Sequence, residues 1–228
     1  MGERGDVRGR AMAGYGQGSE RLRGRQSQED ATFSEPTVVA VTFAFGFYLV
    51  TLLGIMRTGK LTGRNPVIIF RTGNAEEIAA LVAFWLFPLA LIASTFGPET
   101  GIFRLLFNAP ALQFAGIVLL LGGLVLQYVS IVTLGRAFTI GLDPDQQKYL
   151  IRHGPYRYVR HPIYAAFLGY FIGAWMLQPN LFFSIAMPAA ITRVVAQAMK
   201  EEQLLLTTFG AEYRAYMAST RRFIPWIG

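Results

Sequence analysis

Residues 148–164 read Lys-Tyr-Leu-Ile-Arg-His-Gly-Pro-Tyr-Arg-Tyr-Val-Arg-His-Pro-Ile-Tyr, the longest run of charged and aromatic side chains between apolar segments of the chain. Both histidines of the protein, His153 and His161, lie in this run. Its cations and tyrosines are Lys148, Arg152, Arg157 and Arg160, and Tyr149, Tyr156, Tyr158 and Tyr164. A plain connector between two membrane helices does not need these side chains. We therefore expect this loop to bind an anionic, partly aromatic small molecule at a membrane surface.

The composition indicates a polytopic membrane protein with a single membrane domain. Of the 228 residues, 53% are hydrophobic, the mean hydropathy is +0.37, and the apolar residues are concentrated in long runs. The absence of cysteine excludes disulfides and thiolate metal ligands. Two histidines eight residues apart do not suggest a metal cluster either, so we expect no metal.

The net charge of +7 is carried by the membrane domain. Residues 1–35 hold six arginines and six acidic residues, whereas residues 36–228 hold 15 cations and 8 acids. In a membrane protein this excess indicates loops held at a cytoplasmic face. The sequence shows no basic helix that could contact DNA bases and no aromatic surface on which bases could stack, so we expect no nucleic-acid partner.

Residues 1–35 are rich in Gly, Arg, Ser, Gln and Glu, and we expect them to form a disordered tail. They lack the apolar core of a signal peptide, and their six acids disfavour a transit peptide. Residues 36–228 are then the membrane domain. The oligomeric state is not indicated by the sequence.

Apolar runs predict about five membrane-spanning helices, since about 20 residues cross a hydrocarbon core of about 30 Å. The expected spans are 36–56, 76–96, 110–134, 163–177 and 181–199. The last two form a helical hairpin joined by Gln178-Pro179-Asn180, and Pro88 is expected to kink the second span. The fold class is therefore all-α. Lys and Arg in the loops after the first and third spans place residues 135–160 and the C-terminus in the cytoplasm, and the N-terminus outside.

The return arm of the hairpin carries Arg193, Gln197 and Glu201, which form one polar stripe on a helix because they are spaced four residues apart. Arg193 lies at membrane depth, where ionisable groups usually face a cavity or a partner. The tight hairpin returns Glu201 to the membrane face where His161 begins the first arm. We expect Tyr156 and Tyr164 to lie near this pair.

This mixture of side chains suits a zwitterionic ligand. A carboxylate binds an ammonium group or a ribose, cations bind a carboxylate, and tyrosine faces attract a sulfonium. S-adenosylmethionine combines these groups, although other zwitterionic or nucleotide ligands would fit the same side chains.

Three motifs occur in order in the C-terminal part of the chain. Residues 154–164 contain Arg-His-Pro-Ile-Tyr, Glu201-Glu202 follows, and Phe209-Gly210-Ala211-Glu212-Tyr213 comes last. With these elements at this spacing, residues 135–228 resemble the isoprenylcysteine carboxyl methyltransferase family, part of a wider group with phospholipid N-methyltransferases. The resemblance implies an integral membrane enzyme that uses S-adenosylmethionine, with a cytosolic cofactor pocket and a lipophilic acceptor that enters from the bilayer.

The resemblance also implies roles for individual residues. The expected cofactor contacts are Lys148, Tyr149, Leu150, Ile151, Tyr156, His161, Pro162, Ile163, Tyr164 and Glu201. Arg193 and Gln197 are the expected substrate-binding residues. Arg193 and Glu201 are the expected catalytic pair, in which Arg193 orients an anionic acceptor and Glu201 positions the cofactor.

Two positions depart from the carboxyl-methylating branch that this chain resembles. Gln197 stands where that branch has an arginine, and Lys148 where a histidine is usual. Methylation of a small thiol or a lipid at sulfur or nitrogen is therefore an alternative to carboxylate methylation. A sterol-reductase-like enzyme that uses NADPH and a non-enzymatic membrane protein, such as a transporter subunit, are further alternatives.

Overall fold

The computed structural model describes residues 35–62, 75–96, 101–135 and 149–225. This part of the chain is helical and contains no strand, so the predicted all-α fold is confirmed. The elements are α2 (Glu35–Thr62), α3 (Ala75–Phe96), η2 (Gly101–Phe103), α4 (Pro110–Leu134), η5 (Gly154–Arg157), α5 (Pro162–Leu177), α6 (Leu181–Phe209) and α7 (Ala211–Ser219). Residues 1–34 of the predicted tail 1–35 and the predicted cofactor contact Lys148 lie outside the described residues, and Glu35 is the first residue of α2.

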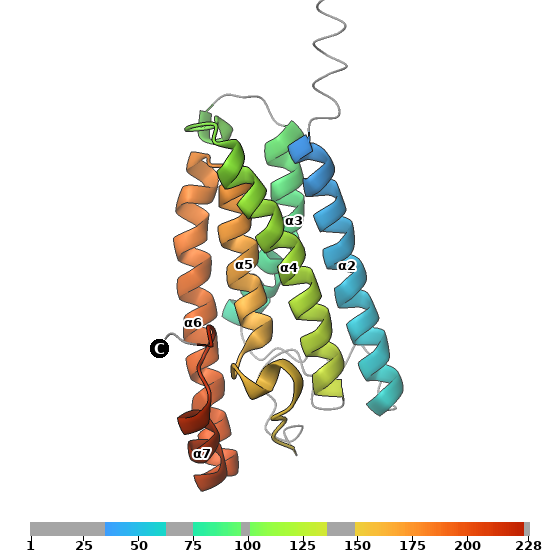
Figure 1. The fold of residues 1–228 in the computed structure, drawn as a ribbon, viewed down its shortest axis with the longest axis vertical. Helices are drawn as coiled ribbons and strands as arrows, with labels where there is room; N and C mark the ends of the chain where they lie inside the picture. The colour runs from blue at the N-terminus through green and yellow to red at the C-terminus, as the bar shows by residue number, and fades with distance from the viewer. Residues whose placement is uncertain (1–34, 63–74, 97–100, 136–148, 226–228) are drawn as a thin grey trace, which may run out of the picture.

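The helices α2 to α6 lie side by side as an elongated bundle, with α7 folded across one end (Figure 1). Three stretches are long and apolar enough to cross a membrane, namely Thr37–Arg57, Pro110–Leu134 and Leu181–Phe209. Val82–Phe96 and Pro162–Leu177 are shorter apolar stretches. Three of the five predicted spans are therefore matched by helices of membrane-spanning length, and the other two by shorter apolar stretches. The hairpin arm α5 is short, as its sequence indicates.

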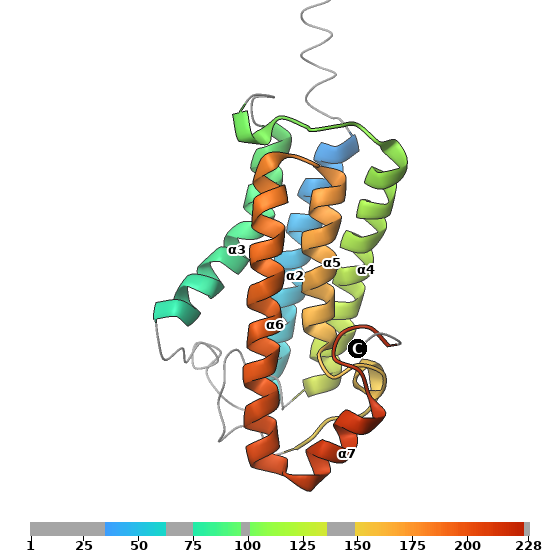
Figure 2. The ribbon, with the colours of Figure 1, turned by 90° about the vertical axis from the view of Figure 1, so that its left-hand side faces the viewer.

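Helix α3 is bent, and its N-terminal part leans away from the other helices (Figure 2). Pro88 lies inside this helix. Proline lacks an amide hydrogen for the helical hydrogen bond, and its ring clashes with a carbonyl group of the preceding turn. These two effects account for the bend.

Helices α4 and α5 pack closely because small residues face each other between them. A Cβ atom added to Gly116 would lie 2.7 Å from the carbonyl oxygen of Gly173, and one added to Gly123 would lie 2.6 Å from the Tyr170 ring. Both distances are too short for a side chain. The glycines are therefore required for the close approach of the two backbones.

A buried polar chain links three helices of the bundle. Tyr170 of α5 donates a hydrogen bond to Oε1 of Gln127 in α4 over 2.6 Å. Nε2 of Gln127 donates to Oγ1 of Thr51 in α2 over 3.3 Å, and this hydroxyl donates to the Phe47 carbonyl. Such chains satisfy polar groups that would otherwise be isolated among apolar side chains.

The C-terminal segment completes one end of the bundle. Helix α6 continues beyond the predicted limit at Met199 to Phe209, and Gly210 ends it with a positive φ of 53°. After α7 the chain returns to the loop before α5, where the backbone N–H of His161 donates to the Arg222 carbonyl over 3.0 Å. Figure 2 shows α7 and this returning segment on the side of the bundle where α5 begins.

Candidate active site

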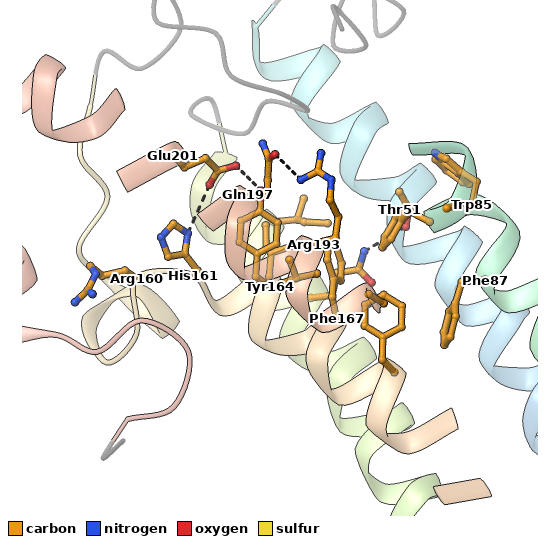
Figure 3. A pocket seen from close by; sticks show the side chains of 18 of the residues that line it. Thr51, Trp85, Phe87, Arg160, His161, Tyr164, Phe167, Arg193, Gln197 and Glu201 are labelled. Carbon is orange, nitrogen blue, oxygen red and sulfur yellow. Dashed lines mark hydrogen bonds and ion pairs between the residues drawn. The ribbon is translucent and has the colours of Figure 1, made fainter. Parts of the chain in front are cut away.

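A cavity of about 780 Å³ lies between α3, α5 and α6 and extends to α7 and to the loop before α5. Its walls include side chains from all five bundle helices and from α7. One end is polar and the other is lined by aromatic and aliphatic side chains (Figure 3). An amphipathic ligand can therefore be bound with its polar and apolar parts in different surroundings.

Glu201 and His161 meet at the polar end, as the tight hairpin predicts. Oε2 of Glu201 lies 3.5 Å from Nδ1 of His161, and Oε1 accepts a hydrogen bond from the Tyr164 hydroxyl. Tyr164 also lies against the His161 ring, with 5.5 Å between the ring centroids. Glu201 is thus a partly exposed carboxylate that faces the cavity with its side chain fixed by two neighbours.

His161 is held at the end of the loop by the structure around it. It precedes Pro162, the first residue of α5, a position where the missing amide hydrogen of proline is harmless. Burial alone would lower the pKa of His161, but the carboxylates of Glu201 and Glu202 outweigh it and raise the pKa above its ordinary value. The two carboxylates therefore stabilise the charged form of the imidazole.

Glu202 has a different environment from Glu201. Its side chain is only 5% exposed and lies between Arg160, whose Nε is 2.9 Å from Oε1, and Arg222, whose NH2 is 2.6 Å from Oε2. Nε2 of His161 is 3.4 Å from Glu202, without the orientation of a hydrogen bond. Glu202 is absent from the cavity wall and joins α6 to the loop and to the C-terminal segment.

Arg160 fixes the C-terminal segment to this end of the bundle. Its NH1 donates to the carbonyl of Thr220 over 2.6 Å and to that of Met217 over 3.2 Å. Its backbone N–H donates to the Arg221 carbonyl over 2.7 Å. The loop before α5 therefore depends on residues more than 50 positions later in the sequence.

Arg193 lies between the two ends of the cavity (Figure 3). It is half-buried, and NH1 donates to Oε1 of Gln197 over 2.9 Å, one helical turn away. The predicted polar stripe therefore faces the cavity. A guanidinium at this depth can bind a carboxylate through two parallel hydrogen bonds.

The apolar end of the cavity extends along α6 toward the hairpin turn. Its aromatic side chains come from α3, α5 and α6, and they include Phe84, Phe87, Phe167, Phe171, Phe182 and Phe183. Phe87 lies with its ring edge-on to Phe171, at 5.0 Å between centroids. This end suits a hydrocarbon chain.

The cavity brings together most of the residues expected from the sequence. The expected residues that line it are Tyr149, Leu150, Ile151, Tyr156, His161, Ile163, Tyr164, Arg193, Gln197 and Glu201. Pro162 is buried at the start of α5 and is absent from the wall. Their roles in binding remain predictions.

The sequence reasoning missed several residues of the cavity wall. Tyr213 and Tyr216 come from α7, and Thr51 and Gln127 come from spans without a recognisable motif. Tyr213 belongs to the Phe-Gly-x-x-Tyr motif, which is recognisable in the sequence. Its place in the cavity wall is not predictable from that motif. Polar residues within the apolar runs 36–56 and 110–134 are the signal that could have indicated Thr51 and Gln127.

Comparison with known proteins supports the resemblance seen in the motifs. Residues 112–212 match the family model described as phospholipid methyltransferase. A probable protein-S-isoprenylcysteine O-methyltransferase of Oryza sativa subsp. indica is 31% identical over 118 residues, which cover 50% of this chain and 62% of the relative. Protein-S-isoprenylcysteine O-methyltransferase A of Arabidopsis thaliana is 30% identical over 115 residues, which cover 49% of this chain and 58% of the relative.

A solved structure shows the same fold. The eukaryotic intramembrane Ras methyltransferase ICMT superposes with a TM-score of 0.58 at 21% identity, over 87% of this chain and 70% of that protein. The match to the first relatives covers about 60% of their length. The chain is thus related to the isoprenylcysteine carboxyl methyltransferases and to the wider phospholipid methyltransferase group, and it has the fold of a polytopic membrane protein.

Proposed function

We propose that this protein is an integral membrane methyltransferase that uses S-adenosylmethionine to methylate a carboxylate of a lipophilic, isoprenylcysteine-like acceptor. The observation that carries the proposal is the amphipathic cavity, with Glu201 and His161 at one end, Arg193 in the middle and aromatic rings at the other. The relatives named protein-S-isoprenylcysteine O-methyltransferases support the same reaction. The catalytic part would be residues 135–228 within the membrane domain 36–228.

The polar end has the side chains that the cofactor requires. Glu201 offers a carboxylate for the ammonium group or the ribose, and Tyr156 and Tyr164 offer aromatic faces near a sulfonium. Leu150 and Ile151 would enclose the cofactor from the loop side, together with the other expected contacts.

Bound S-adenosylmethionine would supply a methyl group on a positively charged sulfur. Arg193 would hold the acceptor carboxylate through charge-assisted hydrogen bonds, with Gln197 beside it. A carboxylate already carries the electron pair that attacks, so Glu201 is not needed as a base and instead positions the cofactor. Alignment of the two reactants and exclusion of water by the aromatic walls would lower the barrier.

We further propose that the polar end faces the cytoplasm and that the acceptor reaches the cavity from the lipid. Arg57, Arg152 and Arg221 are exposed or carry exposed side chains near the ends of the segments on this side of the bundle. The positive-inside rule places such residues in the cytoplasm. The partners would then be membrane lipids and a lipidated acceptor.

A second candidate is methylation of a phospholipid or thiol. The match of residues 112–212 to the phospholipid methyltransferase model favours it, as does Gln197 in place of an arginine. A panel of a prenylcysteine, phosphatidylethanolamine and an alkyl thiol, each incubated with labelled S-adenosylmethionine, separates the candidates. Methyl transfer to the prenylcysteine supports the first candidate, and transfer to either of the others in its place overturns the choice of acceptor.

Calorimetric titration of the detergent-purified protein with S-adenosylmethionine tests the cofactor. We expect saturable binding that His161→Ala and Glu201→Gln each weaken at least tenfold, as expected for lost hydrogen bonds to charged groups. Binding of NADPH in place of S-adenosylmethionine would overturn the proposal and favour a reductase. If the protein binds neither S-adenosylmethionine nor NADPH, residues 148–164 would be a basic, tyrosine-rich membrane anchor.

A further inference from the structure

Three buried side-chain polar atoms in the described residues have no hydrogen-bond partner, and two of them belong to residues that line the cavity. They are Nε2 of His161 and the hydroxyl oxygen of Tyr213, whereas Nδ2 of Asn180 lies at the hairpin turn. His161 is already an expected cofactor contact from the sequence. Tyr213 lines the cavity, but no binding role has been assigned to it so far.

Tyr213 is fixed in place by its surroundings. The side chain is 0% exposed and packs against Tyr216, with 5.9 Å between the ring centroids. Tyr216 donates its own hydroxyl hydrogen to the Tyr156 carbonyl over 2.6 Å. The two tyrosines of α7 therefore differ, since one hydroxyl is engaged by the protein and the other is not.

The Tyr213 hydroxyl is a neutral donor at ordinary pH. Burial raises the pKa of Tyr213, and the nearby carboxylate of Glu202 raises it further, while Arg160 acts in the opposite direction. The oxygen can thus donate one hydrogen bond and accept another.

A buried hydroxyl without a partner destabilises the protein, because it loses its bonds to water and gains none. Phenylalanine would fill nearly the same volume without this penalty. The hydroxyl is therefore best explained by a partner that the polypeptide does not supply. Tyr213 lines the cavity together with Glu201, His161 and Tyr156, so a ligand bound at this polar end is the candidate partner.

We propose that Tyr213 binds the cofactor, with its hydroxyl hydrogen-bonded to an oxygen or nitrogen atom of S-adenosylmethionine. Helix α7 would then form part of the cofactor site. This inference rests on the proposed function, because it assigns the polar end of the cavity to an adenosine-containing sulfonium ligand.

The test compares Tyr213→Phe with two matched variants, each losing one phenolic hydroxyl. We expect Tyr213→Phe to weaken S-adenosylmethionine binding about three- to tenfold, the effect of one hydrogen bond. In the absence of ligand its thermal midpoint should stay the same or rise, since an unpaired buried group is removed. Tyr216→Phe should lower the ligand-free midpoint, because it leaves the Tyr156 carbonyl unpaired. Tyr158→Phe, at an exposed tyrosine outside the cavity wall, should change neither quantity.

The two measurements separate a binding role from a structural one. Unchanged affinity of Tyr213→Phe, with normal binding by the wild type, would overturn the inference and leave the proposed function intact. A lowered ligand-free midpoint for Tyr213→Phe would also overturn it, since the hydroxyl would then have a partner in the protein. If the wild type does not bind S-adenosylmethionine, the proposed function fails and the inference fails with it.

Discussion

The two ends of the cavity are built from different kinds of contact. At the polar end, ion pairs and backbone hydrogen bonds connect α6, the loop before α5 and the C-terminal segment, with Glu202 between Arg160 and Arg222. At the apolar end, aromatic rings such as Phe87 and Phe171 pack without directional bonds. Directional contacts fix a geometry, whereas ring packing tolerates adjustment. The proposed cofactor end is therefore preformed, and the proposed acceptor end can adapt.

The largest effect is expected at the buried carboxylate of the polar end. Glu202→Gln should destabilise the protein by about 2–3 kcal/mol, because it leaves two arginines without their counter-charge. This value is below the roughly 3–5 kcal/mol usual for breaking a fully buried ion pair, because the Arg222 side chain is 35% exposed. Thermal unfolding in detergent measures this.

The matched control is Glu212→Gln. Glu212 pairs with Arg152 at 2.5 Å, but its side chain is 59% exposed, so the change should have little effect. Equal midpoints for the two variants would contradict the view that the polar end is held together by Glu202.

The next largest effect is expected at Arg193, and it distinguishes the acceptor end of the cavity from the cofactor end. Arg193→Ala should raise the KM for the acceptor more than tenfold and change the KM for S-adenosylmethionine less than threefold, because Arg193 lies beyond the polar end. Steady-state kinetics with each reactant varied in turn checks this. Equal increases in both KM values would contradict the assignment of Arg193 to acceptor binding.

A smaller effect is expected from pH. The folded pKa of His161 lies above its ordinary value of about 6.5, so its protonation stabilises the folded state. This stabilisation is complete below about pH 6.5 and is lost as the pH rises through the raised pKa. We therefore expect the thermal midpoint to fall over this range in the wild type.

His161→Gln should abolish this pH dependence. The other histidine, His153, is exposed, and His153→Gln should preserve the pH dependence. If the thermal midpoint of His161→Gln falls with rising pH as much as that of the wild type, another titrating group causes the pH dependence.

The smallest effect is expected at the apolar end. Phe171→Leu should change the preference between shorter and longer isoprenoid acceptors only a few-fold, because the packed rings can rearrange around a smaller side chain. Competition between two acceptors in one reaction measures the ratio. A loss of all activity would contradict an adaptable end, provided that the variant binds S-adenosylmethionine as the wild type does.

Local patterns predicted much of the fold. The span 110–134 matches α4, and Asn180 begins α6 after the predicted turn, its side chain accepting a hydrogen bond from the Phe183 amide over 2.9 Å. These features depend on runs of apolar residues and on turn residues that are close in sequence. The meeting of His161 and Glu201 was also predictable, because a hairpin with arms of similar length returns to its starting level.

Other features depend on contacts between distant segments. Helix α6 continues through Lys200-Glu201-Glu202, beyond the predicted limit at Met199, and Arg160 and Arg222 pair with Glu202 there. The position of Tyr213 depends on how α7 turns at Gly210, which no periodicity specifies. Long-range pairing of this kind is set by three-dimensional packing and leaves no local signal.

The hydrogen bonds from Arg160 and His161 to the carbonyls of residues 220–222 set an order of events during synthesis. Helix α6 ends at Phe209, close to these residues in sequence, so both leave the exit tunnel of the ribosome at nearly the same time. Helices α2 to α5 can enter the bilayer earlier, whereas the polar end closes only after α6 has emerged. We expect a chain truncated before residue 220 to insert its helices in the membrane without forming the closed polar end.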